Sequence, residues 1–238
     1  MQNILKVSLL LIFFASCQKE LELDKIDKID KVSFLIKTAT DTRNGVSITT
    51  NYRYDTQGRV ISTTSTSGEN RVYNYSSNSY EVKIFNGTVA SGSETYYLNN
   101  LPRVDSAVFA GKTDTTARKY IYNGQNWLVQ EKDYNIKNGQ PILVKTTIAE
   151  YDANGNVSRE YNTNNNQISY TYTDLLFNLN AGLIYFGNNK NFIKTSTYSG
   201  YLNSTFSYNY KFDNDDRLIN ETVVDQDGKI ILTEDYTY

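Results

Sequence analysis

The sequence predicts an all-β protein: antiparallel hairpins that follow one another along the chain and form an extended curved sheet or a partly closed barrel. Three observations predict this fold. Beyond Lys31, short runs rich in Thr, Val, Ile and Tyr alternate in a way that is typical of strands. Asn, Asp, Gly and Ser bound these runs, as they bound hairpin turns. A unit of two tyrosines and a turn then recurs along the chain. A compact two-sheet sandwich is the alternative packing.

The first 16 residues have the form of a cleaved export signal. Lys6 precedes an apolar run from Val7 to Ala15 that only Ser8 interrupts. This run is too short for a membrane-spanning helix, which needs about 20 residues. It suits the hydrophobic region of a secretory signal, and the lone cysteine, Cys17, follows where processing would occur.

Residues 17–31 form a charged segment. Gln18, Lys19 and Glu20 follow the cysteine, and tandem Asp-Lys-Ile units run up to Lys31. The segment is too short and too polar to build a core. We therefore expect a tether over 17–31 that joins the amino terminus to a folded body over 32–238.

The residues of the repeated unit account for a tight turn within it. In the clearest copy, Tyr52 and Tyr54 alternate with Arg53, so the two rings project from one strand face. Asp55 then opens a turn and can accept backbone N–H groups, and Gly58 tolerates a positive φ. Further copies, some of them weaker, are centred on the turns opened by Ser76, Asn99, Asn123, Asp152, Asp213 and Asp225.

The spacing of the units reveals an insert. From Asp55 to Asp152 the turn-opening residues lie 21 to 29 residues apart, but the next interval, to Asp213, is 61 residues. A further hairpin accounts for part of this interval. The stretch near 175–191 departs from strict alternation, and we expect an irregular loop or short helix there, in the position of a variable or functional feature.

Composition excludes several classes of function. With 24 Lys and Arg against 26 Asp and Glu, the chain lacks the basic excess of an electrostatic nucleic-acid binder. It has no His, which excludes imidazole catalysis and His-ligated metals, and its single Cys excludes an intrachain disulfide. The clustered carboxylates of Asp213, Asp215 and Asp216 are better explained as turn residues than as a calcium loop. We therefore predict no catalytic residue, cofactor or metal.

The aromatic residues are the candidate binding surface. Tyrosine rings can stack on sugars or on a partner's apolar surface, and they can equally serve only to pack neighbouring strands. The chain has 21 Tyr and one Trp. The residues we predict for this surface are Tyr52, Tyr54, Tyr120, Tyr122, Trp127, Tyr208 and Tyr210.

Three resemblances indicate where the protein is located and which repeat it contains. The segment from Phe14 to Cys17 resembles a bacterial lipobox, with Phe14 in place of the usual Leu, and this implies lipidation of Cys17 after removal of residues 1–16. The alternative is an ordinary signal peptide followed by a free cysteine. The Tyr-Asp-x-x-Gly-Arg-Val units resemble the YD repeats of the RHS type. The order of signal, repeats and insert is similar to a family of Bacteroidota lipoproteins of unknown function. The resemblance implies an outer-membrane lipid anchor with exposure at the cell surface, and it supplies no activity.

These observations lead to one expected function and one alternative. We expect a noncatalytic cell-envelope lipoprotein that acts as a binding or scaffold module for a glycan, a peptide or another envelope protein. The alternative is a hydrolase of an extracellular polymer that uses carboxylates assembled by the fold. The linear sequence offers no preferred carboxylate pair for such an enzyme.

Overall fold

The computed structural model describes residues 35–100, 103–176, 191–200 and 203–238. The predicted signal peptide, the tether and most of the insert near 175–191 lie outside these ranges. The described residues form 16 strands and no helix. The strands are β1 (Thr38–Arg43), β2 (Val46–Tyr54), β3 (Val60–Ser65), β4 (Glu69–Tyr75), β5 (Ser79–Asn86), β6 (Val89–Leu98), β7 (Val104–Gly111), β8 (Thr115–Tyr122), β9 (Leu128–Lys137), β10 (Gln140–Tyr151), β11 (Val157–Asn162), β12 (Gln167–Leu176), β13 (Asn191–Ser199), β14 (Ser204–Phe212), β15 (Leu218–Val224) and β16 (Ile230–Thr237).

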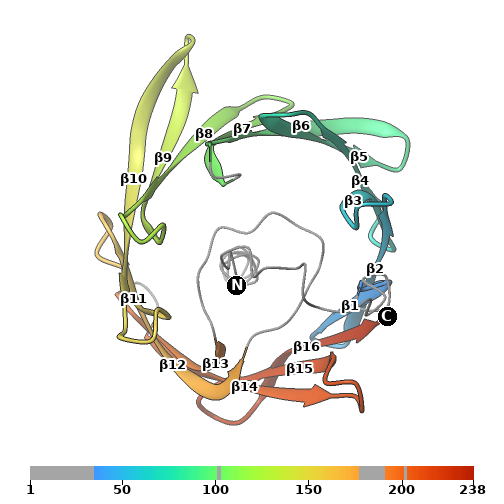
Figure 1. Ribbon diagram of the computed structural model, residues 1–238, viewed down its shortest axis with the longest axis vertical. Coiled ribbons are helices and arrows are strands. Elements are labelled where there is room, and N and C mark those ends of the chain that lie inside the picture. The colour runs from blue at the N-terminus through green and yellow to red at the C-terminus, as the bar shows by residue number, and fades with distance from the viewer. Residues whose placement is uncertain (1–34, 101–102, 177–190, 201–202) are drawn as a thin grey trace.

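The strands form one closed antiparallel barrel in sequence order (Figure 1). Each strand pairs with its neighbours in the chain, and β1 pairs with β16 to close the ring, with Thr38 opposite Thr237. The predicted hairpin meander is confirmed. The two-sheet sandwich is wrong, because all 16 strands belong to a single sheet. Sixteen strands about 4.8 Å apart and tilted by about 40° enclose a backbone ring on the order of 30 Å across.

The turns that follow β2, β4, β6, β8, β10 and β14 lie at one rim of the barrel. In all of them except the shorter Ser76 turn, the backbone N–H of the opening residue bonds to the carbonyl four residues further on. In the first of them, Oδ1 of Asp55 accepts the backbone N–H groups of Gln57 and Arg59, both at 2.9 Å. Nε of Arg59 donates to the other carboxylate oxygen at 2.7 Å, and Gly58 has φ of 77°. We call this end the Asp rim. Its turns are opened by Asp55, Ser76, Asn99, Asn123, Asp152 and Asp213.

A repeated tyrosine hydrogen bond ties each hairpin together at the Asp rim. The phenol of Tyr75, at the end of β4, donates to the carbonyl of Val60, at the start of β3, at 2.8 Å. Seven of the eight hairpins have such a bond, which we call a tyrosine clamp; in the hairpin of β5 and β6 the equivalent position is Leu98, which has no hydroxyl. The seven clamps, at 2.6–2.9 Å, are Tyr54 to Ile36, Tyr75 to Val60, Tyr122 to Val104, Tyr151 to Leu128, Tyr172 to Val157, Tyr210 to Ile193 and Tyr238 to Leu218.

In four of the hairpins, the residue just before the first strand lies against the ring of the clamp tyrosine. The guanidinium of Arg59 lies 4.5 Å from the ring centroid of Tyr75, and that of Arg217 lies 5.1 Å from the ring of Tyr238. In the hairpin of β9 and β10, Trp127 takes this place and its ring lies 4.9 Å from that of Tyr151. The repeated order of tyrosine, turn, Arg and aliphatic residue is therefore one structural device.

Tyr75→Phe is expected to lower the free energy of unfolding by about 1 kcal/mol, because the carbonyl of Val60 loses its buried donor while the ring stays in place. Urea unfolding of the purified protein measures this. Tyr97→Phe is the control, since Tyr97 lies on the opposite face and is 47% exposed. Equal midpoints for the two variants would contradict a stabilising clamp.

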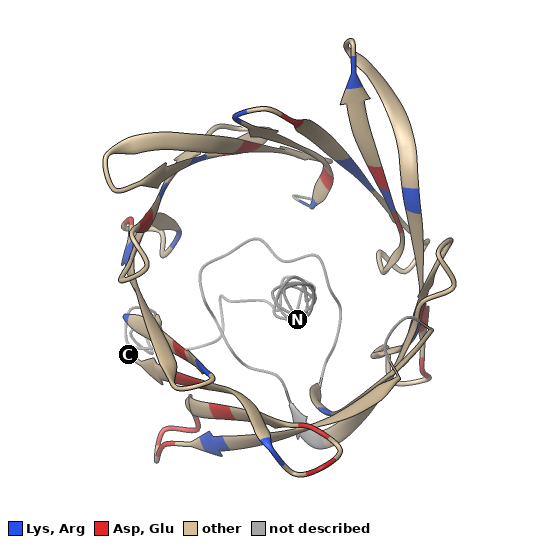
Figure 2. Cartoon of the chain, turned by 180° about the vertical axis from the view of Figure 1, so that it is seen from behind, with Lys and Arg blue, Asp and Glu red and all other residues tan. Residues whose placement is uncertain are grey.

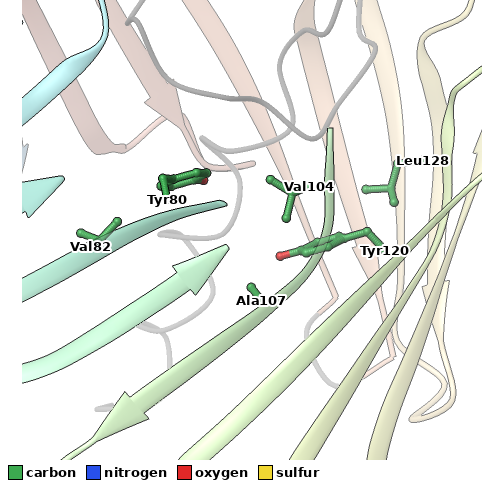
Figure 3. Packing of buried hydrophobic residues seen from close by; sticks show 6 residues of the cluster. All are labelled: Tyr80, Val82, Val104, Ala107, Tyr120 and Leu128. Carbon is green, nitrogen blue, oxygen red and sulfur yellow. The ribbon is translucent and has the colours of Figure 1, made fainter. Parts of the chain in front are cut away.

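The buried apolar side chains form two clusters. The first joins the two ends of the barrel sequence and consists of Ile36, Ala39, Phe192, Leu218 and Tyr236. The second lies on β5 and on the strands β7 to β9 and consists of Tyr80, Val82, Val104, Ala107, Tyr120 and Leu128 (Figure 3). Within it, the rings of Tyr80 and Tyr96 stack with centroids 4.5 Å apart. Aromatic pairs between neighbouring strands thus supply much of the packing, as in a cross-strand ladder.

Candidate functional site

The strand registers sort the side chains onto two faces. Residues directly opposite each other on paired strands project to the same side. One face, which we call the threonine face, carries cross-strand hydroxyl pairs such as Thr40 with Thr49 at 2.9 Å and Thr171 with Thr195 at 2.7 Å. The other, the tyrosine face, carries most of the paired tyrosines and both buried clusters.

The tyrosine face lines the interior of the barrel. Side chains on the concave side of a closed sheet converge, whereas those on the convex side spread apart. Val82, Ala107, Tyr120 and Glu234 are each less than one tenth exposed, and all four lie on the tyrosine face. We therefore assign the threonine face to the outside.

The outer face has the chemistry of a surface in water. Beside its Thr, Ser and Asn side chains it carries charged residues in mid-strand, including Lys83, which is 52% exposed, and an ion pair of Arg159 with Glu150 at 2.8 Å. Figure 2 marks the charged positions of both faces along the strands of the ring. A barrel embedded in lipid instead presents an apolar outer band about 25 Å tall.

The inner face holds a second kind of polar group, buried carboxylates, several of which are paired. Arg118 contacts Glu131 at 3.2 Å and Asp133 at 2.6 Å, and Lys145 contacts Asp133 at 2.8 Å. Elsewhere, the phenol of Tyr170 donates to Glu160 at 2.8 Å. Burial nevertheless raises the pKa of Glu160 to about 7.

Three carboxylates stand side by side where the barrel closes. Asp41 on β1 is directly opposite Glu234 on β16, which is directly opposite Glu221 on β15. We call these three residues the acidic row. Arg43 contacts Asp41 at 2.7 Å. Among the described residues, no Lys or Arg lies within 4 Å of the carboxylate of Glu221 or Glu234.

The acidic row is poorly compensated. Glu234 is only 8% exposed, and its Oε2 is buried without a hydrogen-bond partner. Burial raises the pKa of Glu221 to about 8, and the neighbouring charge of Glu234 adds to the effect. Burial likewise raises the pKa of Glu234 to about 7; a side-chain hydrogen bond with Tyr236 opposes this shift, the charge of Asp41 adds to it, and the charge of Arg43 lowers it. These carboxylates therefore change protonation near neutral pH.

Tyrosine rings frame the acidic row. Tyr210 on β14 is directly opposite Glu221, and Tyr236 lies two residues from Glu234 on the same face. Tyr52 and Tyr210 both pack against the first cluster, which contains Tyr236. Burial, followed by the charge of Glu234, raises the pKa of Tyr52 to about 12. Phenol and carboxylate groups of five strands, β14, β15, β16, β1 and β2, thus meet in one region.

The structure divides the aromatic residues predicted from the sequence into two groups. Tyr52, Tyr54, Tyr208 and Tyr210 lie on β2 and β14, on either side of the acidic row. Tyr120 belongs to the second cluster, as does Tyr122, which packs against it, and Trp127 covers Tyr151 next to that cluster. Tyr54, Tyr122 and Tyr210 are also clamps. The sequence analysis did not single out Glu221 or Glu234, although the alternation of Leu232, Glu234 and Tyr236 places this carboxylate on the tyrosine face.

Two further features of the described ranges concern metal ions and membrane-spanning helices. No group of three or more His, Cys, Asp or Glu side chains there is arranged to hold a metal ion. Within the same ranges, no helix is long and apolar enough to cross a membrane.

The barrel is similar to two solved structures. One is a porin-like protein from Bacteroides uniformis ATCC 8492, with a TM-score of 0.62 at 16% identity, over 85% of this chain and 97% of that chain. The other is a porin-like protein from Bacteroides vulgatus ATCC 8482, with a TM-score of 0.62 at 12% identity, over 86% of this chain and 98% of that chain. At these identities the likeness shows a shared barrel fold. No protein-family model and no curated protein matches the sequence.

Proposed function

We propose that this chain is a noncatalytic binding protein of the cell envelope, held at the outer membrane by a lipid on Cys17, with its ligand site inside the barrel. The observation that carries the proposal is the separation of the two faces. The outer face offers hydroxyls, amides and charges to water, whereas the inner face gathers phenols and buried carboxylates that can contact a ligand.

The difference between the two faces also supports a barrel that is anchored to the membrane by a lipid and does not cross the membrane with its strands. Mid-strand charges such as Lys83 and Glu81 would face hydrocarbon in an embedded barrel, at a free-energy cost of about 2–4 kcal/mol for a Lys at the midplane. The fold shared with porin-like proteins of Bacteroides is compatible with an envelope protein. We therefore place the barrel in water beside the membrane, joined to it by the segment that follows Cys17.

Capture experiments with the full-length protein test the binding function. Immobilised protein is incubated with envelope glycans, periplasmic peptides and solubilised envelope proteins, and captured material is identified by mass spectrometry. We expect capture that weakens when Tyr52 or Tyr208, which face the interior near the acidic row, is replaced by Ala. Tyr97→Ala on the outer face is the control. Equal capture by all three variants would place the binding surface elsewhere.

A second candidate function is the hydrolysis of an extracellular polymer. It is favoured by one observation, the directly opposed carboxylates of Glu221 and Glu234, both with pKa values raised by burial. Glycoside hydrolases use two carboxyl groups about 5–10 Å apart. Turnover of a captured glycan that is abolished by Glu221→Gln and unaffected by Glu81→Gln would establish the enzyme. Capture without turnover would exclude it for that glycan.

Cys17→Ser is expected to abolish incorporation of labelled fatty acid and to release the protein from the membrane fraction, because a multiply acylated terminus supplies the anchor. Metabolic labelling and fractionation of cells measure both effects, and protease treatment of intact cells measures surface exposure. Ser16→Ala keeps a small residue before the cysteine and serves as the control. A mature chain that retains Met1 and lies in the cytoplasm would contradict the anchor.

A further inference from the structure

We infer that the acidic row of Asp41, Glu234 and Glu221 is the binding site for an organic cation that carries N–H donors, such as a primary ammonium or a guanidinium group. The inference rests on the proposed binding function and names the chemistry of its ligand. It follows from three observations on the strands β15, β16 and β1.

The first observation is that three acidic residues occupy directly opposed positions on neighbouring strands. Glu221 and Glu234 are directly opposed, and Glu234 is directly opposed to Asp41. Like charges in directly opposed positions destabilise a sheet. Elsewhere on the inner face the acids have basic partners, as Glu131 and Asp133 have in Arg118. In the acidic row, Arg43 pairs with Asp41, and the two glutamates have no basic partner within 4 Å among the described residues. Among the described residues, the two glutamates therefore have no basic side chain that compensates their charge when they are ionised.

The second observation is the buried, unpartnered Oε2 of Glu234. A buried carboxylate oxygen without a donor loses its hydration and regains nothing from the protein. A ligand that donates an N–H to this oxygen would recover that free energy. A quaternary ammonium has the charge but no donor, so the geometry selects for a primary ammonium or a guanidinium.

The third observation is the aromatic surround. Tyr210 on β14 is directly opposite Glu221, and Tyr52 lies on β2, at the other side of the row. Both rings pack against the first cluster, which contains Tyr236 of β16. Ring faces attract cations and also cover the alkyl part of an amine. Carboxylates and rings together suit a lysine or arginine side chain of a peptide, or a polyamine.

Calorimetric titration of the full-length lipidated protein in nonionic detergent at pH 8 tests the inference. The probes are n-butylammonium and n-propylguanidinium, with tetramethylammonium and n-butanol as controls. We expect binding of at least one of the two donors, at least tenfold more tightly than either control. Because Glu221 and Glu234 would ionise on binding, the measured heat at pH 7 should also depend on the ionisation enthalpy of the buffer, which shows proton release. Absence of binding by both donors at 50 mM, a concentration on the order of that needed for millimolar affinity, would overturn the inference.

Three variants locate the site. Glu234→Gln and Glu221→Gln are each expected to weaken binding at least tenfold, whereas Glu81→Gln removes the same charge from the outer face and should leave it unchanged. Arg43→Gln removes the competing guanidinium beside Asp41 and is expected to tighten binding, a gain that misfolding cannot produce. If both glutamate variants bind like the wild type, the probe binds elsewhere and the inference fails.

The outcomes also separate this inference from the proposed function. Amine binding at the acidic row without capture of any glycan, peptide or envelope protein would retain the cation site and reject the wider function. Capture of an envelope ligand that does not compete with butylammonium would retain the wider function and reject the acidic row as its site.

Discussion

The barrel is expected to be more stable toward urea at pH 5 than at pH 8.5, by several kcal/mol. The carboxyls of Glu160, Glu221 and Glu234 have pKa values of about 7, 8 and 7 in the folded protein, whereas an unfolded Glu titrates near 4.5. Between these values the folded state binds more protons than the unfolded state, so stability falls as pH rises from about 5 to about 8. Each group contributes on the order of 3 kcal/mol if it acts alone, and less within the coupled pair.

The variant that replaces both Glu221 and Glu234 by Gln is the control for this prediction, because it removes two of the three groups and should flatten the pH profile. Below about pH 4 the trend should reverse. The backbone N–H of Arg59 lowers the pKa of Asp55 below its usual value, and that stabilising contribution is lost as the carboxylate takes up a proton. The titration of the acidic row also depends on its charged and titratable neighbours. These are Arg43, Tyr52, Tyr210 and Tyr236. A urea midpoint that is unchanged between pH 5 and pH 8.5 would show that the glutamates are hydrated in the folded barrel.

Phe192→Ala is expected to lower the free energy of unfolding by about 3–5 kcal/mol, the range for removing a fully buried Phe side chain. Phe192 is 1% exposed in the first cluster. Its ring lies 4.7 Å from that of Tyr210 and 5.4 Å from that of Phe212, so the substitution leaves a cavity between β13 and β14. Urea unfolding at pH 5, where the glutamates are protonated, isolates the packing effect from the electrostatic one.

Tyr97→Ala is the matched control for the loss of Phe192, since it also removes an aromatic ring but from the outer face, where the side chain is 47% exposed. We expect a change below about 1 kcal/mol for it. The slope of the free energy with urea should stay constant for both variants if the barrel still unfolds in one step. If both variants lost a similar free energy of unfolding, the two faces would be packed equally, and the first cluster would not act as a hydrophobic core.

The turns and the hairpin order could be predicted from the sequence because they are local. Asp55 and Gly58 lie within one turn, and their hydrogen bonds need no distant partner. Closure could not be predicted in the same way. It depends on the pairing of β1 with β16, whose residues Thr38 and Thr237 lie far apart in the chain, and on the accumulated twist of all the strands between them.

The candidate site was predicted only in part for the same reason. Alternation places Tyr52 and Tyr54 on one face of their strand, and the structure confirms this placement, with the two ring centroids 6.4 Å apart. The tyrosine clamps were missed, because a phenol that ends one strand and a carbonyl that begins the previous strand have no recognisable spacing. The acidic row was missed because Asp41 meets Glu234 only after the ring has closed.

Because the first and last strands pair, the sheet formed by the described residues has no edge, and every strand has a hydrogen-bonded neighbour on both sides. Lys37 donates its backbone N–H to Thr237 at 2.7 Å and its side chain to the carbonyl of Tyr238 at 2.8 Å, so the two ends of the described body are neighbours. A short peptide that joins Tyr238 to Ile36, with a break at the turn of Asn138 and Gly139, would preserve every strand pairing. The fold is therefore suited to circular permutation, and the permuted chain would begin and end at the rim opposite the Asp rim while the acidic row stays intact.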